Sequence, residues 1–402
     1  MKRLPWLVLL SLLSACAARP PVPEAPPARP APVEPAPPLT PPLIPSTPLS
    51  FPTLRPVEWT EVAGWPGETV AAALEAFLRG CKVLARQSAW NDVCTDAAAL
   101  PAPDDATARA FFETRFLPYQ ATTEDGGDEG LVTGYYEPLL KGDRQRGARA
   151  RFPIYGVPDD LITVDLASVY PELKNLRLRG KLVGNKLVPY PTRRDIDAPD
   201  FRGKAIAWAE DPVDLFFLQI QGSGRIELPD GAHLRLGYAD QNGHPYKSIG
   251  KLLVERGELR LEQASMQGIK RWGAANPDKL PELLAENPSY VFFRELPNGL
   301  PGPLGALGVP LVGERTIAVD PRFVPLGAPV FLATTRPNSA QPMERLVMAQ
   351  DTGGAIRGGV RADYFWGFGA EAGELAGKMK QRGRAWVLLP REFPLLTGNG
   401  GP

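Results

Sequence analysis

The segments QDTGGAIRG (residues 350–358) and RADYFWG (residues 361–367) place two carboxylates, Asp351 and Asp363, twelve residues apart. Asp351 opens a glycine-rich turn after an apolar run, and Asp363 precedes three consecutive aromatic residues. A partly desolvated carboxyl group has a raised pKa, which suits a proton donor near neutral pH. An Asx turn at Asp351 and an aromatic core contact at Asp363 would give the same pattern without any function. The surrounding sequence decides between these two interpretations.

The composition is that of a folded soluble protein. The 402 residues include 45 basic and 45 acidic side chains, and 44% of the residues are hydrophobic. A formal net charge of zero gives no indication of a nucleic-acid partner. Proline is the exception to the average composition, with 46 residues.

The first fifty residues predict an export signal and a tether. Lys2 and Arg3 precede a short apolar stretch, and LSAC (residues 13–16) resembles the bacterial lipobox. We therefore expect a lipoprotein signal peptide at 1–15, lipid attachment at Cys16, and an outer-membrane anchor with the body in the periplasm. An ordinary signal peptide with an incidental cysteine is the alternative. Residues 16–49 are expected to form a lipidated, proline-rich, semi-rigid tether, since fourteen of residues 20–48 are proline.

Two further cysteines, Cys81 and Cys94, leave two possibilities open. In an oxidising periplasm they would form one disulfide, and otherwise they would be two buried free thiols. Neither has the neighbours of a catalytic thiolate.

The hydrophobic pattern predicts short strands interrupted by a few helices. Helical spacing covers 70–89, 107–116, 249–256, 261–274, 280–286 and 370–379. Strands are predicted at 130–140, 154–157, 161–164, 182–188, 216–221, 225–228, 317–319, 329–333, 346–349 and 385–389. The strand at 130–140 is expected to be broken by its proline, and 182–188 to form a hairpin with a Gly-Asn turn. Several short strands with intervening turns favour barrels rather than a doubly wound sheet.

Carboxylates remain the candidate catalytic groups once metal sites, serine nucleophiles and glycine-rich phosphate loops are weighed. The two histidines, His233 and His244, form no ligand cluster with cysteines or carboxylates, so we expect no metal and no cofactor. Ser223 lacks a nucleophile-elbow pattern, and no glycine-rich loop precedes a helix.

Three functions are compatible with the two aspartates. Asp351-Thr352-Gly353 matches the aspartic-protease signature, but a protease needs two such aspartates and the chain has one. Glycan cleavage needs a carboxylic acid that protonates the glycosidic oxygen, with aromatic rings beside it to stack on sugars. A wall-binding barrel of the expansin type would loosen glycan without cutting it. The aromatic residues available for stacking are Tyr135, Tyr136, Tyr190, Tyr246 and Trp366.

Most of the chain after the tether resembles the membrane-bound lytic murein transglycosylase A family. The resemblance rests on TGYYEP (133–138), YPTR (190–193), FLQIQGSG (217–224), GYA (237–239), NGHPY (242–246), SYVFFR (289–294) and the region of Asp320, Asp351 and Asp363. Departures are small: Arg194-Asp195-Ile196 stands where the family usually has Ala-Glu-Ile, and Asp240-Gln241 precedes Asn242 where a glycine is common.

The resemblance implies a mainly β fold with flanking helices. A double-psi β-barrel catalytic domain is expected at 50–137 plus 298–402, an inserted β domain at 138–297, and a glycan groove between them. It also implies non-hydrolytic cleavage of the β-1,4 bond between N-acetylmuramic acid and N-acetylglucosamine in peptidoglycan. The product is a 1,6-anhydromuramoyl end, and no cofactor takes part. Protein partners, such as cell-wall synthesis or division proteins, are not indicated by the sequence.

The resemblance also assigns roles to individual residues. Asp363 is expected to be the single acid/base, because the muramoyl C6 hydroxyl supplies the nucleophile. Asp351 is expected to orient the substrate or to keep the pKa of Asp363 high, and Asp320 to be structural. Substrate contacts are expected from Thr133, Tyr135, Gln219, Gln221, Gly353 and Trp366.

Overall fold

The structure is a computed structural model that describes residues 51, 53–67, 69–100, 104–170, 173 and 176–395. The predicted signal peptide, the lipid attachment at Cys16 and the proline-rich tether lie outside the described residues. Within the described part of the chain, no helix is both long enough and apolar enough to cross a membrane.

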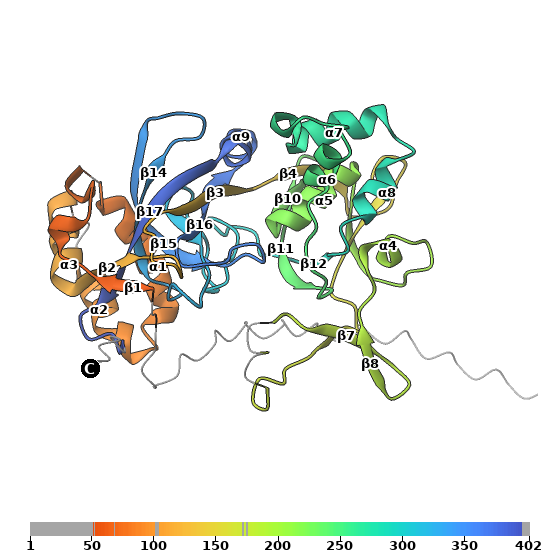
Figure 1. Cartoon of the computed structure of the whole chain (residues 1–402). Coiled ribbons are helices and arrows are strands. Elements are labelled where there is room, and N and C mark those ends of the chain that lie inside the picture. Colours follow the sequence, from red (N-terminus) through yellow and green to blue (C-terminus); the bar gives the residue numbers. More distant parts are fainter. Residues whose placement is uncertain are drawn as a thin grey trace, which may run out of the picture. The chain divides into compact units, whose positions relative to one another are not determined.

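Six strands of the first sheet close into a barrel (Figure 1). Each strand pairs with the next around the ring, and the last pairs with the first: β17–β14–β15–β13–β16–β3–β17. Two of these pairs are parallel, β13–β15 and β16–β3. The strands are β3 (Gly130–Glu137), β13 (Thr316–Ala318), β14 (Pro329–Thr335), β15 (Pro342–Asp351), β16 (Arg361–Phe368) and β17 (Lys380–Pro390). The expected mainly β fold with a double-psi barrel is confirmed.

The same sheet extends beyond the ring and is covered by helices. The far end of β17 pairs with β2 (Phe116–Ala121), and β2 pairs with β1 (Leu54–Pro56). The helices are α1 (Ala71–Leu84), α2 (Ser88–Ala99), α3 (Asp105–Arg115) and α9 (Ala370–Lys378), with short 3-10 turns at Trp59–Glu61 and Trp65–Gly67. Aromatic rings from α1, α3 and β2 pack together in the core beneath α1: Phe77, Phe111, Phe112 and Phe116.

A disulfide joins α1 to α2. Cys81 and Cys94 are bonded, with their Cα atoms 5.3 Å apart. The sequence left open whether this bond forms. It also did not predict α2 as a separate helix, because the expected helix ran on to residue 89.

A second, six-stranded sheet is formed by the chain between β3 and β13. Its strand order is β12–β11–β10–β4–β9–β5. These strands are β4 (Leu139–Asp143), β5 (Phe152–Tyr155), β9 (Ala205–Ala209), β10 (Ser223–Glu227), β11 (His233–Gln241) and β12 (Val291–Glu295). A small third sheet contains β6 (Ile162–Thr163), β7 (Arg179–Val183) and β8 (Lys186–Pro189), with the predicted Gly-Asn turn between the last two. The accompanying helices are α4 (Arg193–Ile196), α5 (Pro212–Gln221), α6 (Ile249–Glu255), α7 (Met266–Ala275) and α8 (Leu280–Ala285), with a 3-10 turn at Leu261–Gln263.

The predicted strand at 216–221 is wrong, because these residues form the second half of α5. Asp211 caps the helix by accepting hydrogen bonds from the amides of Val213 and Asp214, and Pro212 occupies its first turn. Gly222 ends the helix with a left-handed φ of 76°. These caps outweigh the strand-like apolar run. The prediction of a strand broken by proline at 130–140 is confirmed, since Pro138 separates β3 from β4.

Candidate active site

Asp351 and Asp363 lie in one row across four neighbouring strands. Ala318 on β13 pairs with Asp351 on β15 and with Asp363 on β16, and Asp363 pairs with Thr133 on β3. Residues aligned across a sheet project from the same face, and adjacent strands are ~4.8 Å apart, so the Cα atoms of the two aspartates are roughly 10 Å apart. The two carboxylates that the sequence singled out are therefore brought to one face of the barrel wall.

A β-bulge places Asp351 in this row. The register with β13 passes from Ala349 directly to Asp351, which leaves Gln350 as the extra residue. Gln350 is fully buried, and its side-chain amide donates to the carbonyl of Ala76 on α1 at 2.8 Å. Bulges of this kind redirect a side chain next to an active site.

Asp363 is a half-buried carboxyl with a raised pKa. Burial raises the pKa of Asp363 to about 6; the Thr133 hydroxyl and the Arg361 charge act in the opposite direction. Thr133 Oγ1 donates to Asp363 Oδ1 at 2.5 Å. The negative charge of Asp351 also raises this pKa, which is the direction expected from the sequence, but its contribution is the smallest.

Asp351 accepts three hydrogen bonds. Its donors are the Tyr135 hydroxyl at 2.9 Å, the Ala306 amide at 3.0 Å and the Thr352 amide at 2.9 Å. Burial raises the pKa of Asp351, and these three donors, which favour the charged form, oppose that effect. Burial, reinforced by the negative charges of Asp351 and Asp363, raises the pKa of Tyr135 well above its ordinary value, so this hydroxyl stays a donor. The two carboxyl groups therefore have unequal environments.

A small apolar cluster supports the two aspartates from the same face of the sheet. The rings of Tyr135 and Phe365 lie 5.0 Å apart, and Ala318 and Ile356 pack with them. A Cβ at Gly353 would come within 2.7 Å of the Ile356 side chain, so the close approach at Gly353 requires glycine.

Trp366 does not offer a surface for a sugar, contrary to the sequence prediction. Along β16, Ala362, Tyr364 and Trp366 alternate with Asp363 and belong to the main hydrophobic core. Trp366 is 5% exposed, and its indole N–H points at the Met379 sulfur at 3.2 Å. Of the other aromatic residues proposed for stacking, Tyr135, Tyr136 and Tyr190 are buried and Tyr246 is 48% exposed.

Asp320 is fully buried and bonded on both oxygens. Arg322 forms an ion pair with it at 2.6 Å, and the Gly358 amide donates to it at 3.0 Å. Burial alone raises the pKa of Asp320, but the bonds from Arg322 and Gly358 outweigh it and hold that pKa below its usual value. The carboxylate fixes the end of the loop that leads into β16.

The two glutamines of the FLQIQGSG segment lie on α5 rather than on a strand. Gln219 is buried, and its side-chain oxygen accepts a hydrogen bond from Arg193. The Arg193 guanidinium in turn lies over the rings of Phe216 and Tyr290. Gln221 is half-buried and accepts a hydrogen bond from the Tyr136 amide at 3.1 Å, which ties α5 to β3. Gln219 is therefore held within the second sheet's own packing, and Gln221 next to the barrel.

The sequence did not indicate two groups that act on the aspartates. Arg361 influences the pKa of Asp363, and its position two residues earlier on the same strand was the available signal. The Ala306 amide binds Asp351 from a loop 45 residues away, and no local pattern marks it.

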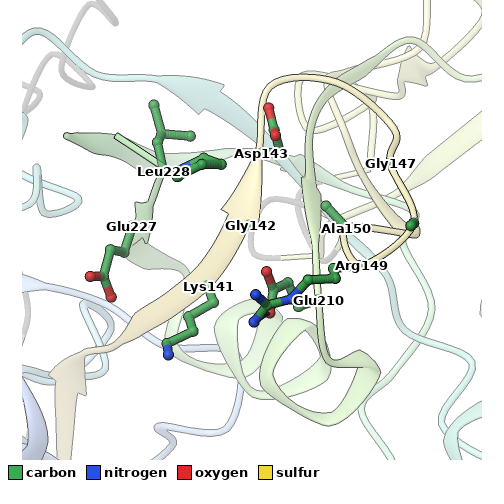
Figure 2. Close-up of a pocket in the computed structure, with 11 residues that line it drawn as sticks. Lys141, Gly142, Asp143, Gly147, Arg149, Ala150, Glu210, Glu227 and Leu228 are labelled. Atoms are coloured by element: carbon green, nitrogen blue, oxygen red, sulfur yellow. Dashed lines mark hydrogen bonds and ion pairs between the residues drawn. The ribbon is translucent and has the colours of Figure 1, made fainter. Parts of the chain in front are cut away.

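Two open cavities are lined by residues other than the aspartates. The first, of about 490 Å³, is on the second sheet, where Lys141 of β4, Glu227 of β10 and the paired Arg149 and Glu210 line it (Figure 2). The second, of about 460 Å³, is lined by residues that include Glu129, Arg361 and Arg382. Neither is lined by Asp351 or Asp363. The described residues hold no group of three or more His, Cys, Asp or Glu side chains arranged to bind a metal ion.

Two family models match parts of the chain. The model of the MltA specific insert domain matches residues 131–294, and the model of the 3D domain matches residues 315–389. Their order follows the structure, in which the second sheet interrupts the strands of the barrel. The chain is thus a protein of the class in which a 3D domain is combined with this insert.

Named relatives identify the family. The curated membrane-bound lytic murein transglycosylase A of Escherichia coli strain K12 is 36% identical over 264 residues, and the match covers 64% of each chain. The crystal structure of MltA from Neisseria gonorrhoeae is 44% identical with a TM-score of 0.75, covering 86% of this chain and 97% of that one. The structure of E. coli MltA with bound chitohexaose is 28% identical with a TM-score of 0.64, covering 84% and 94%. The chain belongs to the membrane-bound lytic murein transglycosylase A family.

Proposed function

We propose that this protein is a lytic transglycosylase that cleaves peptidoglycan glycan strands. The observation that carries the proposal is the unequal pair of aspartates in one row of the barrel wall. The family supports it, as does the chitohexaose bound by the E. coli relative, which indicates a binding site for a β-1,4 glycan in that protein. The match to the curated E. coli relative spans about 64% of its length, so the activity is proposed here from the site as well as from the family.

Asp363 is the proposed acid. A pKa of about 6 leaves an appreciable fraction of its carboxyl groups protonated near neutral pH, when an ordinary aspartate is almost fully ionised. The protonated Asp363 gives its proton to the glycosidic oxygen as the bond from C1 of N-acetylmuramic acid to that oxygen breaks.

The same carboxylate then acts as the base. As the muramoyl C6 hydroxyl oxygen bonds to C1, its proton passes to the Asp363 carboxylate, which restores the starting acid. No water is consumed, and the product carries a 1,6-anhydro ring. One carboxyl group is sufficient because the nucleophile belongs to the substrate and is already positioned.

Asp351 is the proposed supporting carboxylate. Three donors fix its orientation, and a charge placed near C1 would stabilise the positive character that develops there in the transition state. We assign Thr133 and Tyr135 to holding Asp363 and Asp351, and Gly353, Gln219 and Gln221 to shaping the substrate groove. Asp320 has a structural role in this proposal.

The proposed domains follow the two sheets. The catalytic barrel comprises 50–137 plus 298–402, the inserted domain comprises 138–297, and the glycan lies in a groove between them. The eight-stranded sheet uses strands from 54–137 and 316–390, and the six-stranded sheet uses strands from 139–295, which supports these limits.

The proposed location is the outer membrane, with a lipid on Cys16 and the body in the periplasm. A Cys16→Ala variant should lose incorporation of radiolabelled palmitate and leave the membrane fraction. Retention of both label and membrane association would contradict the anchor.

Product analysis on isolated murein sacculi tests the activity. The wild-type protein should release muropeptides with 1,6-anhydro ends, each one water lighter than the product of hydrolysis. Asp363→Ala should lower this release by at least 10²-fold while binding to sacculi persists. Asp92→Asn, at an exposed position on α2, is the control and should behave as wild type. A fully active Asp363→Ala variant would overturn the assignment of the acid, and wild-type protein without anhydro products would overturn the reaction itself.

A further inference from the structure

A buried carboxylate stands where the chain leaves the barrel. Glu137 is the last residue of β3 and is 1% exposed. Arg225 on β10 and Arg235 on β11 form ion pairs with its two oxygens, at 2.8 Å and 3.4 Å. Both arginines belong to the second sheet, so this group, which we call the crossing triad, links the barrel to the insertion.

The crossing triad is tied to both connections between the two sheets. On the outgoing connection, the Arg225 amide donates to the Pro138 carbonyl at 2.8 Å. On the returning connection, the Arg235 guanidinium donates to the Leu300 carbonyl, and the Leu296 amide donates to the Arg235 carbonyl at 2.8 Å. One carboxylate thus holds the two chain segments through which the insertion is joined to the barrel.

The barrel side of the crossing triad is the end of β16, the strand that carries Asp363. The Arg225 guanidinium lies 3.7 Å from the centroid of the Phe368 ring, and the Gly369 amide donates to the Glu137 carbonyl at 3.1 Å. Glu137 and Phe368 are also partners in the β3–β16 register. The triad therefore fixes the position of β3 relative to β16 at one end of their pairing.

The same strand, β3, carries both side chains that bind the aspartates. Thr133 donates to Asp363, and Tyr135, two residues further on, donates to Asp351. Between Tyr135 and Glu137, the Tyr136 amide is held by Gln221 of α5. Because β3 is paired on both sides and closely packed, a displacement at Glu137 is passed along the strand to Tyr135, two residues away, and to Thr133, four residues away.

We propose that Glu137, through Arg225 and Arg235, is a positioning residue for glycan cleavage. It acts through Thr133 and Tyr135, and it holds the inserted sheet in place against the strand that supports the acid. The proposal rests on the proposed transglycosylase activity. Glu137 and Asp320 are the two buried carboxylates among the described residues, and of these only Glu137 pairs with two arginines from the second sheet.

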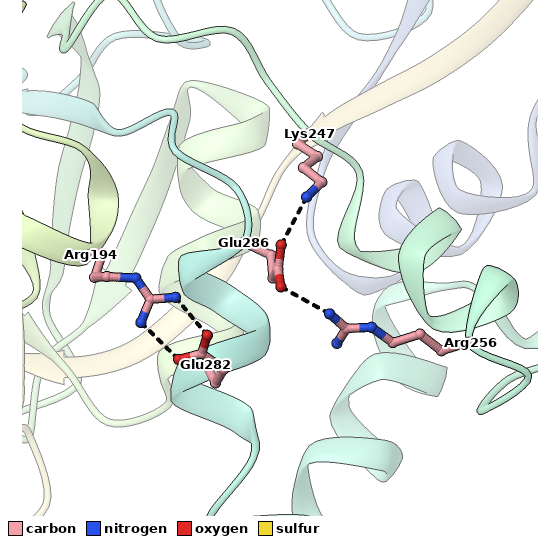
Figure 3. A network of polar contacts seen from close by, with 5 residues as sticks. All are labelled: Arg194, Lys247, Arg256, Glu282 and Glu286. Carbon is pink, nitrogen blue, oxygen red and sulfur yellow. Dashed lines mark hydrogen bonds and ion pairs between the residues drawn. The ribbon is translucent and has the colours of Figure 1, made fainter.

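The test uses Glu137→Gln in the full-length protein, with a second glutamate as the matched control. Glu286 also stands between two cations, Lys247 at 2.8 Å and Arg256 at 2.9 Å, but all three lie next to the ends of helices α6 and α8 of the insertion (Figure 3). Glu286→Gln makes the same chemical change without touching β3. Initial rates on soluble uncrosslinked glycan strands give kcat and KM, and amide hydrogen exchange reports on residues 130–137.

Glu137→Gln should lower kcat at least 10-fold and speed exchange in 130–137, while Glu286→Gln keeps both values within twofold of wild type. The pH dependence gives a readout that a general loss of stability would not move. Loss of the Thr133 bond raises the pKa of Asp363, so the fall of kcat at high pH should shift to higher pH in Glu137→Gln alone. Unchanged exchange in 130–137, or a normal kcat together with a normal pH profile, would overturn the proposal.

A milder variant keeps the proposal falsifiable if Glu137→Gln does not fold. Arg225→Gln removes the more exposed arginine and leaves the pair of Glu137 with Arg235. It should show the same changes in exchange, kcat and pH profile with smaller amplitude, and wild-type behaviour in all three would overturn the proposal. Exchange in 130–137 requires no activity. A wild-type protein that releases no anhydro product therefore overturns the proposed function, whereas unchanged exchange overturns the crossing triad.

Discussion

Thr133 and Asp363 lie opposite one another in the parallel pair β3–β16, and the Thr133 hydroxyl donates to the Asp363 carboxylate at 2.5 Å. This hydrogen bond favours the charged form of Asp363, whereas burial favours the neutral form. The balance leaves the pKa at about 6 rather than higher. The strand that supports the acid thereby also adjusts its acidity.

Removing the Thr133 hydroxyl should change the pH dependence of the reaction. Without its donor, Asp363 has a higher pKa and stays protonated to a higher pH. Because the acid must be protonated to start the reaction, the fall of kcat at high pH should move upward in Thr133→Val, and kcat should fall roughly 10-fold from the lost positioning. Initial rates between pH 4 and 9 measure both effects. Thr133→Ser keeps the hydroxyl and should retain the wild-type profile; an unchanged profile in Thr133→Val would contradict the role of the bond.

Asp363 should also reduce stability at neutral pH. The pKa is raised from 3.8 to about 6 in the folded state, so the folded protein binds this proton more tightly than the unfolded chain does. The stabilisation that this group gives is therefore fully present below pH 4 and is lost as the pH rises through 6. The free energy of unfolding falls by at most about 3 kcal/mol over this range. Asp363→Asn should raise Tm at pH 7.5 and change it little at pH 3.5. Calorimetry measures Tm at the two pH values. An equal change in Tm at both would show that the charge of Asp363 is not the cause.

Local patterns in the sequence predicted the barrel strands other than β16, and the double-psi barrel itself was expected from the family resemblance. In β16, core residues alternate with residues of the opposite face, and the predicted break at Pro138 separates β3 from β4. The same alternation explains an error. Three consecutive aromatic residues after Asp363 suggested a shared environment, yet Phe365 is on the acid's face while Tyr364 and Trp366 are in the main core.

The composition of the site could be predicted only in part. Asp351 and Asp363 were identified from their neighbours, but their alignment depends on Ala318, which lies in a three-residue strand and pairs with both. Pairing between distant strands is set by the closed barrel, and no local window contains it. For the same reason the sequence did not show that Thr133 and Tyr135, which were expected to contact substrate, bind the two carboxylates.

Removing the Tyr135 hydroxyl should weaken catalysis without unfolding the barrel. Tyr135→Phe keeps the ring against Phe365 but deprives Asp351 of one of its three donors. A hydrogen bond to a charged group contributes about 1.5–3 kcal/mol, so kcat should fall roughly 10–100-fold if Asp351 acts in the transition state. Tyr119→Phe, at a buried tyrosine of β2, is the matched control. Equal rates in both variants would show that Asp351 does not depend on this donor.

The disulfide between Cys81 and Cys94 should stabilise the helices that support the catalytic strand. Closing a loop of this length restricts the unfolded chain and contributes about 3 kcal/mol. Cys81→Ala/Cys94→Ala should therefore unfold at lower denaturant concentration than wild type, and thiol reduction of the wild type should reproduce the change. At 25 °C kcat should stay within twofold, because the Gln350 side chain still anchors β15 to the Ala76 carbonyl of α1. If kcat falls while the protein remains folded, the geometry of Asp351 depends on the disulfide itself, and the anchor at Gln350 is not enough to hold the strand.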